Sequence, residues 1–331
     1  IESTDQSLHR PIDERRRFCS LTAPTVSIIA SVRLTRPVMI VNIIGMLINI
    51  PLDFCLIYGW AFFPELGIAG AGIATVFSSA SITLILVLLV FRKTHEDRFK
   101  VMSGRSFDLA LIKRLLRFGV PGSMQLCIDI SAFVIFIMIV GRLGIEELAA
   151  TNIALSISAI AFMPSYGTSQ GVAVLVGQSL GRTRPDQGRL ATISAIHLLL
   201  FYILMVDLVF IFSPQIVVAI FIPETTAAAD YGPVMDKAVT IMRIMACYLL
   251  LDALYMIFAG VLKGAGDTRY LMCAILAASI FCFLIPLWIG IELFDRGIFF
   301  AWGCVLSFVF SLFLLTWLRY RQGRWQQMSV I

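Results

Sequence analysis

Residues 236–269 read DKAVTIMRIMACYLLLDALYMIFAGVLKGAGDTR, and this stretch decides the fold class. Its first part is a largely apolar run of about 27 residues, longer than the roughly 20 that a helix needs to cross a bilayer. A glycine-rich turn that carries Lys263, Asp267 and Arg269 follows. We therefore predict a membrane-spanning helix that ends in a charged turn.

Asp252 lies inside this apolar run. An aspartate at the centre of a membrane helix costs about 2.5–3.5 kcal/mol on insertion scales. Tyr248 precedes it by four residues, so both side chains lie on one helical face. A carboxylate and a phenol on one face can share a cation or a proton, which makes the pair a candidate site.

The composition extends the membrane prediction to the whole chain. Hydrophobic residues make up 59% of the 331 residues and charged residues 14%, with a mean hydropathy of +0.90. A soluble core of this size could not bury so much apolar surface, whereas a bilayer can. The seven cysteines show no C-x-x-C spacing and no cluster with histidine, so we expect neither disulfides nor a cysteine metal site.

Further apolar runs predict an all-α fold, a polytopic membrane helix bundle. The eight predicted spans are residues 38–59, 68–92, 117–142, 147–178, 192–213, 236–262, 270–293 and 297–319. An even number of spans puts both termini on one side of the membrane.

Basic residues orient this bundle. Alternate loops hold eighteen of the 26 Lys and Arg residues: 33–36, 92–117, 179–191, 263–269 and 319–324. The intervening loops hold Arg142, Lys237 and Arg296. The positive-inside rule therefore predicts a multi-pass protein of the inner (plasma) membrane with both termini in the cytoplasm. Topology accounts for the net charge of +5, so the expected partner is the lipid bilayer and not a nucleic acid.

Three short motifs occur twice at a nearly constant offset. They are Thr35-Arg36 and Thr268-Arg269, Ile50-Pro51-Leu52 and Ile285-Pro286-Leu287, and Gly67-Ile68 and Gly297-Ile298. Such repetition is typical of transporters built from parallel repeats. Within the second copy, which begins at residue 117, four predicted spans precede the Thr-Arg motif, whereas the first copy has at best half a span before its own, so we expect the first copy to begin about 116 residues before Ile1.

This arrangement predicts two six-helix lobes in the intact protein, of which the chain holds the last two helices of one and all of the other. Residues 1–33 would be a polar, partly helical remnant, 34–92 the end of the first lobe, 93–116 a cytoplasmic inter-lobe linker and 117–331 the second lobe.

Asp129 is a second acid inside the predicted second lobe. It lies twelve residues from Arg117, and Asp252 lies ten residues from Leu262. At about 1.5 Å per residue, both acids are roughly 15–18 Å from the cytoplasmic end. Two acids at one depth suggest a shared cation or proton site, since acids in spans usually mark ion pathways. The alternative is a pair of polar residues bonded between helices without a transport role.

Two other acids lie inside predicted spans. Asp53 follows Asn49 by four residues, which places an amide and an acid on one face and predicts a possible proton or second site. Asp207 is a lone acid near the outer end of its span, and no role can be assigned to it from the sequence.

Five segments of the chain form a recognisable set: LTRPVMIVNIIGMLINIPLDFCLIYG, FPELGIAGAGIATV, LRFGVPGSMQLCIDIS, GVAVLVGQSLG and YLLLDALYMIFAGVLKGAGDTR. Through these segments the chain resembles a NorM-type transporter of the multidrug and toxic compound extrusion (MATE) family. The family fold has twelve helices in two bundles around a central cavity, and the resemblance implies that this chain supplies helices five to twelve.

The resemblance also implies site residues. NorM-type members bind Na⁺ through an acid in helix seven and a Tyr-x-x-x-acid pair in helix ten, which match Asp129, Tyr248 and Asp252. Proton-linked relatives use an Asn-x-x-x-Asp pair in helix five, which matches Asn49 and Asp53. The helix-seven acid is usually Glu, so the shorter Asp129 implies a different cation geometry. No cofactor is implied, and no metal beyond Na⁺.

The function implied is a monomeric cation-coupled antiporter that exports organic cations and multiple drugs by alternating access. We favour Na⁺ over H⁺ because two acids and a phenol offer several oxygens to a cation. One alternative is a lipid-linked saccharide flippase of the same superfamily, for which the intramembrane Arg243 is the supporting residue. Another is a fragment that does not transport, because the first helices are absent.

An enzyme is the least favoured interpretation. Residues 264–267 (GAGD) match the G-x-G-D motif of intramembrane aspartyl proteases, but the Tyr-Asp and Pro-Ala-Leu motifs that such proteases need do not occur. We expect Asp267 to be exposed in a cytoplasmic turn and salt-bridged between Lys263 and Arg269. We therefore predict that the protein is not an enzyme.

Overall fold

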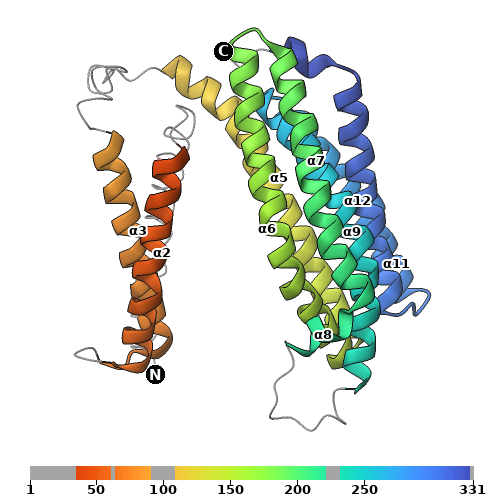
Figure 1. Cartoon of the computed structure of the whole chain (residues 1–331). Coiled ribbons are helices and arrows are strands. Elements are labelled where there is room, and N and C mark those ends of the chain that lie inside the picture. The colour runs from red at the N-terminus through yellow and green to blue at the C-terminus, as the bar shows by residue number, and fades with distance from the viewer. Residues whose placement is uncertain (1–34, 61–63, 91–108, 221–231, 329–331) are drawn as a thin grey trace. The chain divides into compact units, whose positions relative to one another are not determined.

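In the computed structural model, the described residues are 35–60, 64–90, 109–220 and 232–328, and no strand occurs among them (Figure 1). The all-α prediction is confirmed. The elements are α2 (Thr35–Tyr58), α3 (Gly67–Val90), α5 (Leu109–Leu143), α6 (Ile145–Gly181), α7 (Pro185–Phe212), α8 (Pro214–Ala219), α9 (Gly232–Gly264), α10 (Thr268–Ala277), the π-helix η1 (Ala278–Leu284), α11 (Ile285–Glu292), α12 (Ile298–Arg321) and the 3₁₀ turn η2 (Arg324–Gln327).

Eight helical stretches among the described residues are long and apolar enough to cross a membrane, which agrees with the eight predicted spans. One of them is the continuous run from α10 through η1 to α11. Several helices extend past the predicted spans. The helix α5 begins at Leu109, inside the predicted linker, because hydrogen-bonded helix continues into residues whose polarity ends the apolar pattern.

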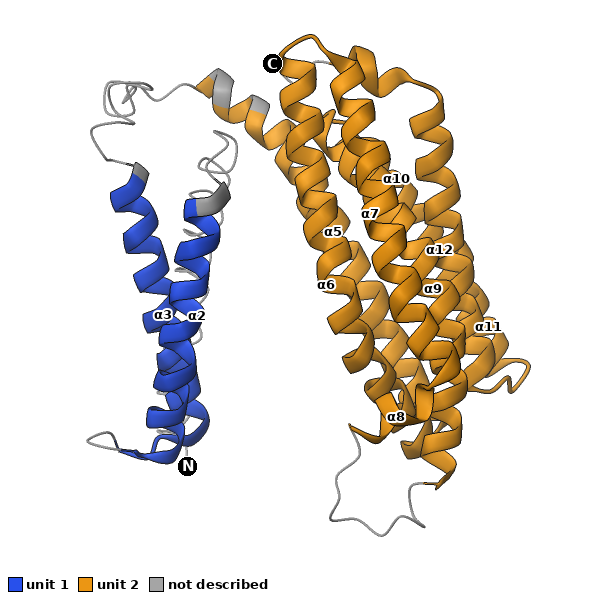
Figure 2. Cartoon of the chain, viewed as in Figure 1, with its two compact units in different colours: residues 1–107 blue, residues 108–331 orange. Residues whose placement is uncertain are grey.

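The chain divides into two compact units, residues 1–107 and residues 108–331 (Figure 2). The predicted remnant 1–33 lies outside the described residues, and so does 93–108 of the predicted linker. The assignment of these units to two lobes stays a prediction.

In unit 1, α2 and α3 pack against each other. Gly59 adopts a positive φ of 67° where the chain leaves α2. At Gly70 of α3, a Cβ atom would collide with the carbonyl group of Leu56, so glycine permits the close approach of the two helices.

The repeated sequence motifs occupy equivalent places in the two copies. Each Thr-Arg motif lies at the start of a helix, α2 or α10. Each Ile-Pro-Leu motif lies further along the same continuous helical run, in α2 or in α11. Each Gly-Ile motif lies where the next helix, α3 or α12, begins. The correspondence therefore extends from sequence to local structure.

In unit 2, α9 is the most buried of the eight spans and packs against α6, α7 and α12. Its tightest contact is with α6. A Cβ atom at Gly260 would lie 2.5 Å from the Ser169 carbonyl oxygen, and one at Gly264 would collide with the carbonyl of Ala173. The Ser169 hydroxyl donates a 2.6 Å hydrogen bond to the Met256 carbonyl. These small residues let the two backbones approach closely, as is common between membrane helices.

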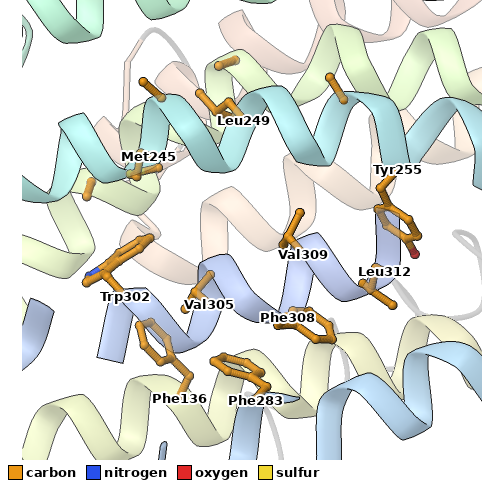
Figure 3. Packing of buried hydrophobic residues seen from close by; sticks show 14 of the residues in the cluster. Phe136, Met245, Leu249, Tyr255, Phe283, Trp302, Val305, Phe308, Val309 and Leu312 are labelled. Atoms are coloured by element: carbon orange, nitrogen blue, oxygen red, sulfur yellow. The ribbon is translucent and has the colours of Figure 1, made fainter. Parts of the chain in front are cut away.

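An aromatic cluster fills the space between α5, η1 and α12. Phe136 lies 5.7 Å, ring centre to ring centre, from both Phe283 and Trp302, and Phe283 stacks on Phe308 at 5.1 Å (Figure 3). Phe283 lies in the π-helix η1, and Pro286 follows in the next turn. The extra residue per turn of a π-helix changes which side chains face inward.

Ion pairs join helices at both ends of unit 2. At one end, the Lys237 amine lies 2.8 Å from a Glu146 carboxylate oxygen and 2.6 Å from one of Glu147. At the other end, Asp267 pairs with Arg319 at 2.7 Å. The expectation that Asp267 is exposed between Lys263 and Arg269 is wrong. Its side chain is only 11% exposed because α12 supplies an arginine that covers it.

Candidate cation site

An acidic cavity of about 200 Å³ lies inside unit 2, between α5, α6, α9 and α12. The predicted residues Asp129, Tyr248 and Asp252 all line it. Asp252 is buried, with 4% of its surface exposed. The structure thus brings the three residues together, and their role as a cation site stays a prediction.

Helical spacing explains how α9 reaches the cavity. Tyr248, Asp252 and Tyr255 are separated by four and three residues, so successive turns of the helix direct them to one side. Opposite them, α5 contributes Asp129. Figure 3 shows Tyr255 on α9 beside Leu312 of α12, which also lines the cavity.

The charges in the cavity are unbalanced. Asp129 and Asp252 lie close enough for their carboxylates to repel each other. Lys263, eleven residues after Asp252 on the same face of α9, attracts Asp129 electrostatically. Charges interact more strongly in a protein interior than in water. A cation between the two carboxylates would replace their repulsion with two attractions.

The rest of the lining is mostly apolar. Phe133, Phe162 and Phe308 contribute aromatic walls, and Ser158 contributes a hydroxyl. A volume of 200 Å³ accommodates an ion and a few waters, since a water occupies about 30 Å³ in the liquid. Pockets for drug-sized ligands usually measure about 300–1,000 Å³. The cavity therefore fits an inorganic cation better than a drug.

Among the described residues, the cysteines are free and no group of three or more His, Cys, Asp or Glu side chains is placed to hold a metal ion. The oxygens that supplement the two carboxylates come from neutral side chains. These are the hydroxyls of Tyr248, Tyr255 and Ser158.

Sequence reasoning missed Tyr255 and Gln125. The Gln125 amide nitrogen donates a long, 3.5 Å hydrogen bond to the Tyr255 hydroxyl, and both residues are 5% exposed. Each lies within one helical turn of a predicted acid, Gln125 four residues before Asp129 and Tyr255 three residues after Asp252. That spacing was the one signal in the sequence that could have identified the two residues as part of the site. Their contact joins positions 130 residues apart, so only the tertiary structure reveals it.

The second predicted pair lies in unit 1. Asn49 and Asp53 are half-buried, one turn apart on α2. The Asn49 amide nitrogen and one Asp53 carboxylate oxygen are buried without a hydrogen-bond partner among the described residues. The two side chains therefore share a face, as predicted, without bonding each other through these atoms.

Two other intramembrane charges lie outside the cavity lining. Asp207 is 6% exposed, and one of its carboxylate oxygens has no hydrogen-bond partner among the described residues. Arg243 is exposed on α9. The cavity lining contains no Arg or Lys, so Arg243 gives this cavity no basic character.

Comparison with known proteins agrees with this architecture. A family model described as MatE matches residues 121–288. The chain is 27% identical over 251 residues to "Probable multidrug resistance protein NorM" of Mannheimia succiniciproducens, covering 75% of the chain and 52% of that protein. It is 31% identical over 237 residues to "Multidrug resistance protein MdtK" of Yersinia enterocolitica, covering 71% and 50%. The chain thus spans about half the length of these curated relatives.

Two solved structures share the fold. A MATE crystal structure in the bent conformation superposes with a TM-score of 0.82 at 17% identity, covering 97% of this chain and 69% of the other. A eukaryotic MATE transporter superposes with a TM-score of 0.79 at 19% identity, covering 92% and 66%. At such identities the likeness concerns the fold alone.

Proposed function

Because this chain belongs to the MATE family, whose members are membrane transporters and not enzymes, we propose that it forms the cation-coupling part of an antiporter that exports organic cations. The coupling ion binds between Asp129 and Asp252, next to Tyr248. We further propose alternating access, in which the two six-helix lobes of the whole protein rock about a central cavity. The protein works as a monomer in the inner membrane with both termini in the cytoplasm.

One observation carries the proposal: two mutually repelling carboxylates face a small cavity inside membrane-spanning helices. Acids in such positions are costly, and they usually mark ion pathways. A bound cation offsets the free-energy cost of holding the two carboxylates together in the membrane. The cation therefore binds more tightly to conformations in which the acids are close than to those in which they are apart. Such a difference is what allows an ion gradient to drive a conformational change.

We propose Na⁺ as the driving ion, with Asp53 and Asn49 modulating transport or carrying a proton. Several oxygens surround the two acids, and hard metal cations bind through several oxygens at once. A proton, in contrast, requires a single carboxylate.

The binding step can be tested on the 331-residue chain purified in detergent, whether or not the chain transports by itself. We expect saturable ²²Na⁺ binding in the wild type and none in Asp252→Asn. The matched control is Asp207→Asn, which alters a buried acid outside the cavity and should bind Na⁺ normally. Normal Na⁺ binding by Asp252→Asn would remove this residue from the site.

Coupling is tested in membrane vesicles that contain the whole protein. Drug efflux is measured under a Na⁺ gradient at fixed pH, and then under a pH gradient without Na⁺. We expect efflux only in the first condition, with loss in Asp252→Asn. Full efflux without Na⁺ that is lost in Asp53→Asn but kept in Asp252→Asn would overturn the assignment and favour H⁺.

A flippase for lipid-linked saccharides receives no support from the cavity. Anionic substrates of that kind need basic side chains, and the cavity lining contributes acids. We therefore propose no second function.

A further inference from the structure

We propose that Gln125 and Tyr255 complete the cation site and determine its preference for Na⁺ over H⁺. The inference rests on the proposed function, since it assigns two further oxygen donors to the same site. It concerns selectivity, whereas the two acids supply the charge that any cation needs.

Tyr255 belongs to the cavity lining, and Gln125 lies behind the lining and is hydrogen-bonded to Tyr255. Gln125 lies one turn before Asp129 on α5, and Tyr255 lies one turn after Asp252 on α9. The hydrogen bond from the Gln125 amide nitrogen to the Tyr255 hydroxyl joins the two helices at 3.5 Å. Tyr255 lines the cavity, and both carboxylates act electrostatically on its hydroxyl group. Each helix thus carries an acid and a neutral oxygen donor on adjacent turns.

The carbonyl oxygen of Gln125 is buried without a hydrogen-bond partner among the described residues. A buried acceptor in this state costs free energy unless a donor or a cation satisfies it. A cation next to Asp129 is a partner within reach of this oxygen, because Gln125 is one helical turn away.

The hydroxyl group of Tyr255 has a matching capacity. A phenol oxygen carries two lone pairs and one hydrogen. With one lone pair accepting from Gln125, the other remains for a cation, and the hydrogen can be donated to a carboxylate. Gln125 therefore positions Tyr255 in addition to offering its own oxygen.

The number of oxygens separates the two candidate ions. Na⁺ is held by several oxygens, as hard metal cations are, whereas a proton binds a single carboxylate. Asp129, Tyr248 and Asp252 supply part of a coordination shell, and the oxygens of Gln125 and Tyr255 extend it. Removal of either oxygen should weaken Na⁺ binding and leave proton binding nearly unchanged.

The charged groups around the cavity do not distinguish Na⁺ from H⁺. Its titratable lining consists of Asp129 from α5 and Tyr248, Asp252 and Tyr255 from α9, while α6 and α12 contribute no titratable side chain to it. Lys263 acts on Asp129 from outside the lining and repels Na⁺ and H⁺ alike. Discrimination between the two ions therefore depends on the neutral oxygen donors.

The test uses Tyr255→Phe and Gln125→Leu in the purified chain, with ²²Na⁺ binding measured as a function of Na⁺ concentration and of pH. We expect each variant to raise the Kd for Na⁺ by about tenfold, since hydrogen-bonding groups next to charges contribute about that much. Protons compete with Na⁺ for the site, and the pH at which they displace half of the bound Na⁺ is extrapolated to zero Na⁺. This pH should be the same in each variant as in the wild type. Melting temperature in Na⁺-free buffer reports whether each variant folds.

The matched control is Thr151→Val. The Thr151 hydroxyl is also buried and without a partner among the described residues, but unlike Gln125 it makes no hydrogen bond to a residue of the cavity lining. We expect this variant to keep the wild-type Kd for Na⁺.

The outcomes separate this inference from the proposed function. Wild-type Na⁺ affinity in both Tyr255→Phe and Gln125→Leu, with binding still abolished by Asp252→Asn, would overturn the inference and leave the proposed function standing. Equal weakening of Na⁺ and proton binding would also overturn it, because the pair would then not discriminate. Retention of Na⁺ binding by Asp252→Asn would refute the proposed function itself.

Discussion

Lys263 acts electrostatically on Asp129 from a distance. It is half-buried at the end of α9, forms no ion pair with another described residue, and attracts Asp129. Its positive charge partly neutralises Asp129 and repels a cation that approaches the cavity. Within a low-dielectric interior such an effect persists over several ångströms.

We therefore expect Lys263→Met to strengthen Na⁺ binding by about threefold to tenfold. Arg269→Met is the matched control, because it removes the same charge from an exposed side chain five residues after Gly264. ²²Na⁺ binding to both variants measures the difference. Equal strengthening in the two variants would mean that general surface charge, and not the electrostatic interaction with Asp129, sets the effect.

At the scale of elements, the contact between α6 and α9 holds the acidic face of α9 in place. Gly260 and Gly264 lie one turn apart and pack against the Ser169 and Ala173 backbone of α6. Without a hydrophobic driving force between helices in lipid, close packing of small residues supplies much of the association energy. A side chain at either glycine would move α9 and the residues it presents to the cavity.

Gly264→Ala should therefore destabilise the protein by about 1–3 kcal/mol, the usual cost of overpacking. Gly171→Ala on α6 serves as control, because a Cβ atom there meets no atom within 4 Å. That variant should be neutral or slightly stabilised, since alanine favours helix by about 1 kcal/mol over glycine. Thermal unfolding in detergent compares the two. Similar melting temperatures would show that the α6–α9 contact tolerates an added methyl group.

At the scale of the whole molecule, the distribution of basic residues predicts which ends of the helices face the cytoplasm. The turn between α6 and α7 carries Arg182 and Arg184 and belongs to the predicted cytoplasmic set. The turn between α11 and α12 belongs to the opposite set.

Single cysteines at Gln187 and Phe294, two exposed positions next to these turns, test the topology in a background without native cysteines. We expect a membrane-impermeant maleimide added to intact cells to label Phe294→Cys and to label Gln187→Cys only after lysis. The reverse labelling pattern would show that all spans have the opposite orientation in the membrane.

The eight spans, the all-α class and the pairing of Tyr248 with Asp252 on one face could be predicted from the sequence. These features depend on local quantities, namely the length of apolar runs and the helical period. A bilayer core offers no water to the backbone N–H and C=O groups, so an apolar run that crosses it forms a helix. The same rise per residue predicted a shared depth for Asp129 and Asp252, and the two acids line one cavity. Helix ends were less predictable, as the early start of α5 shows, because hydrogen bonding continues into polar residues.

What the sequence by itself determined is therefore which segments cross the membrane and which side chains share a face of one helix. Only the tertiary structure decided which faces meet. It paired Gln125 of α5 with Tyr255 of α9 and Asp267 with Arg319 of α12, and it enclosed the two acids in one cavity. The physical reason is that these contacts depend on how closely helices approach, which small residues such as Gly260 and Gly264 set through packing, and a one-dimensional pattern does not contain that information.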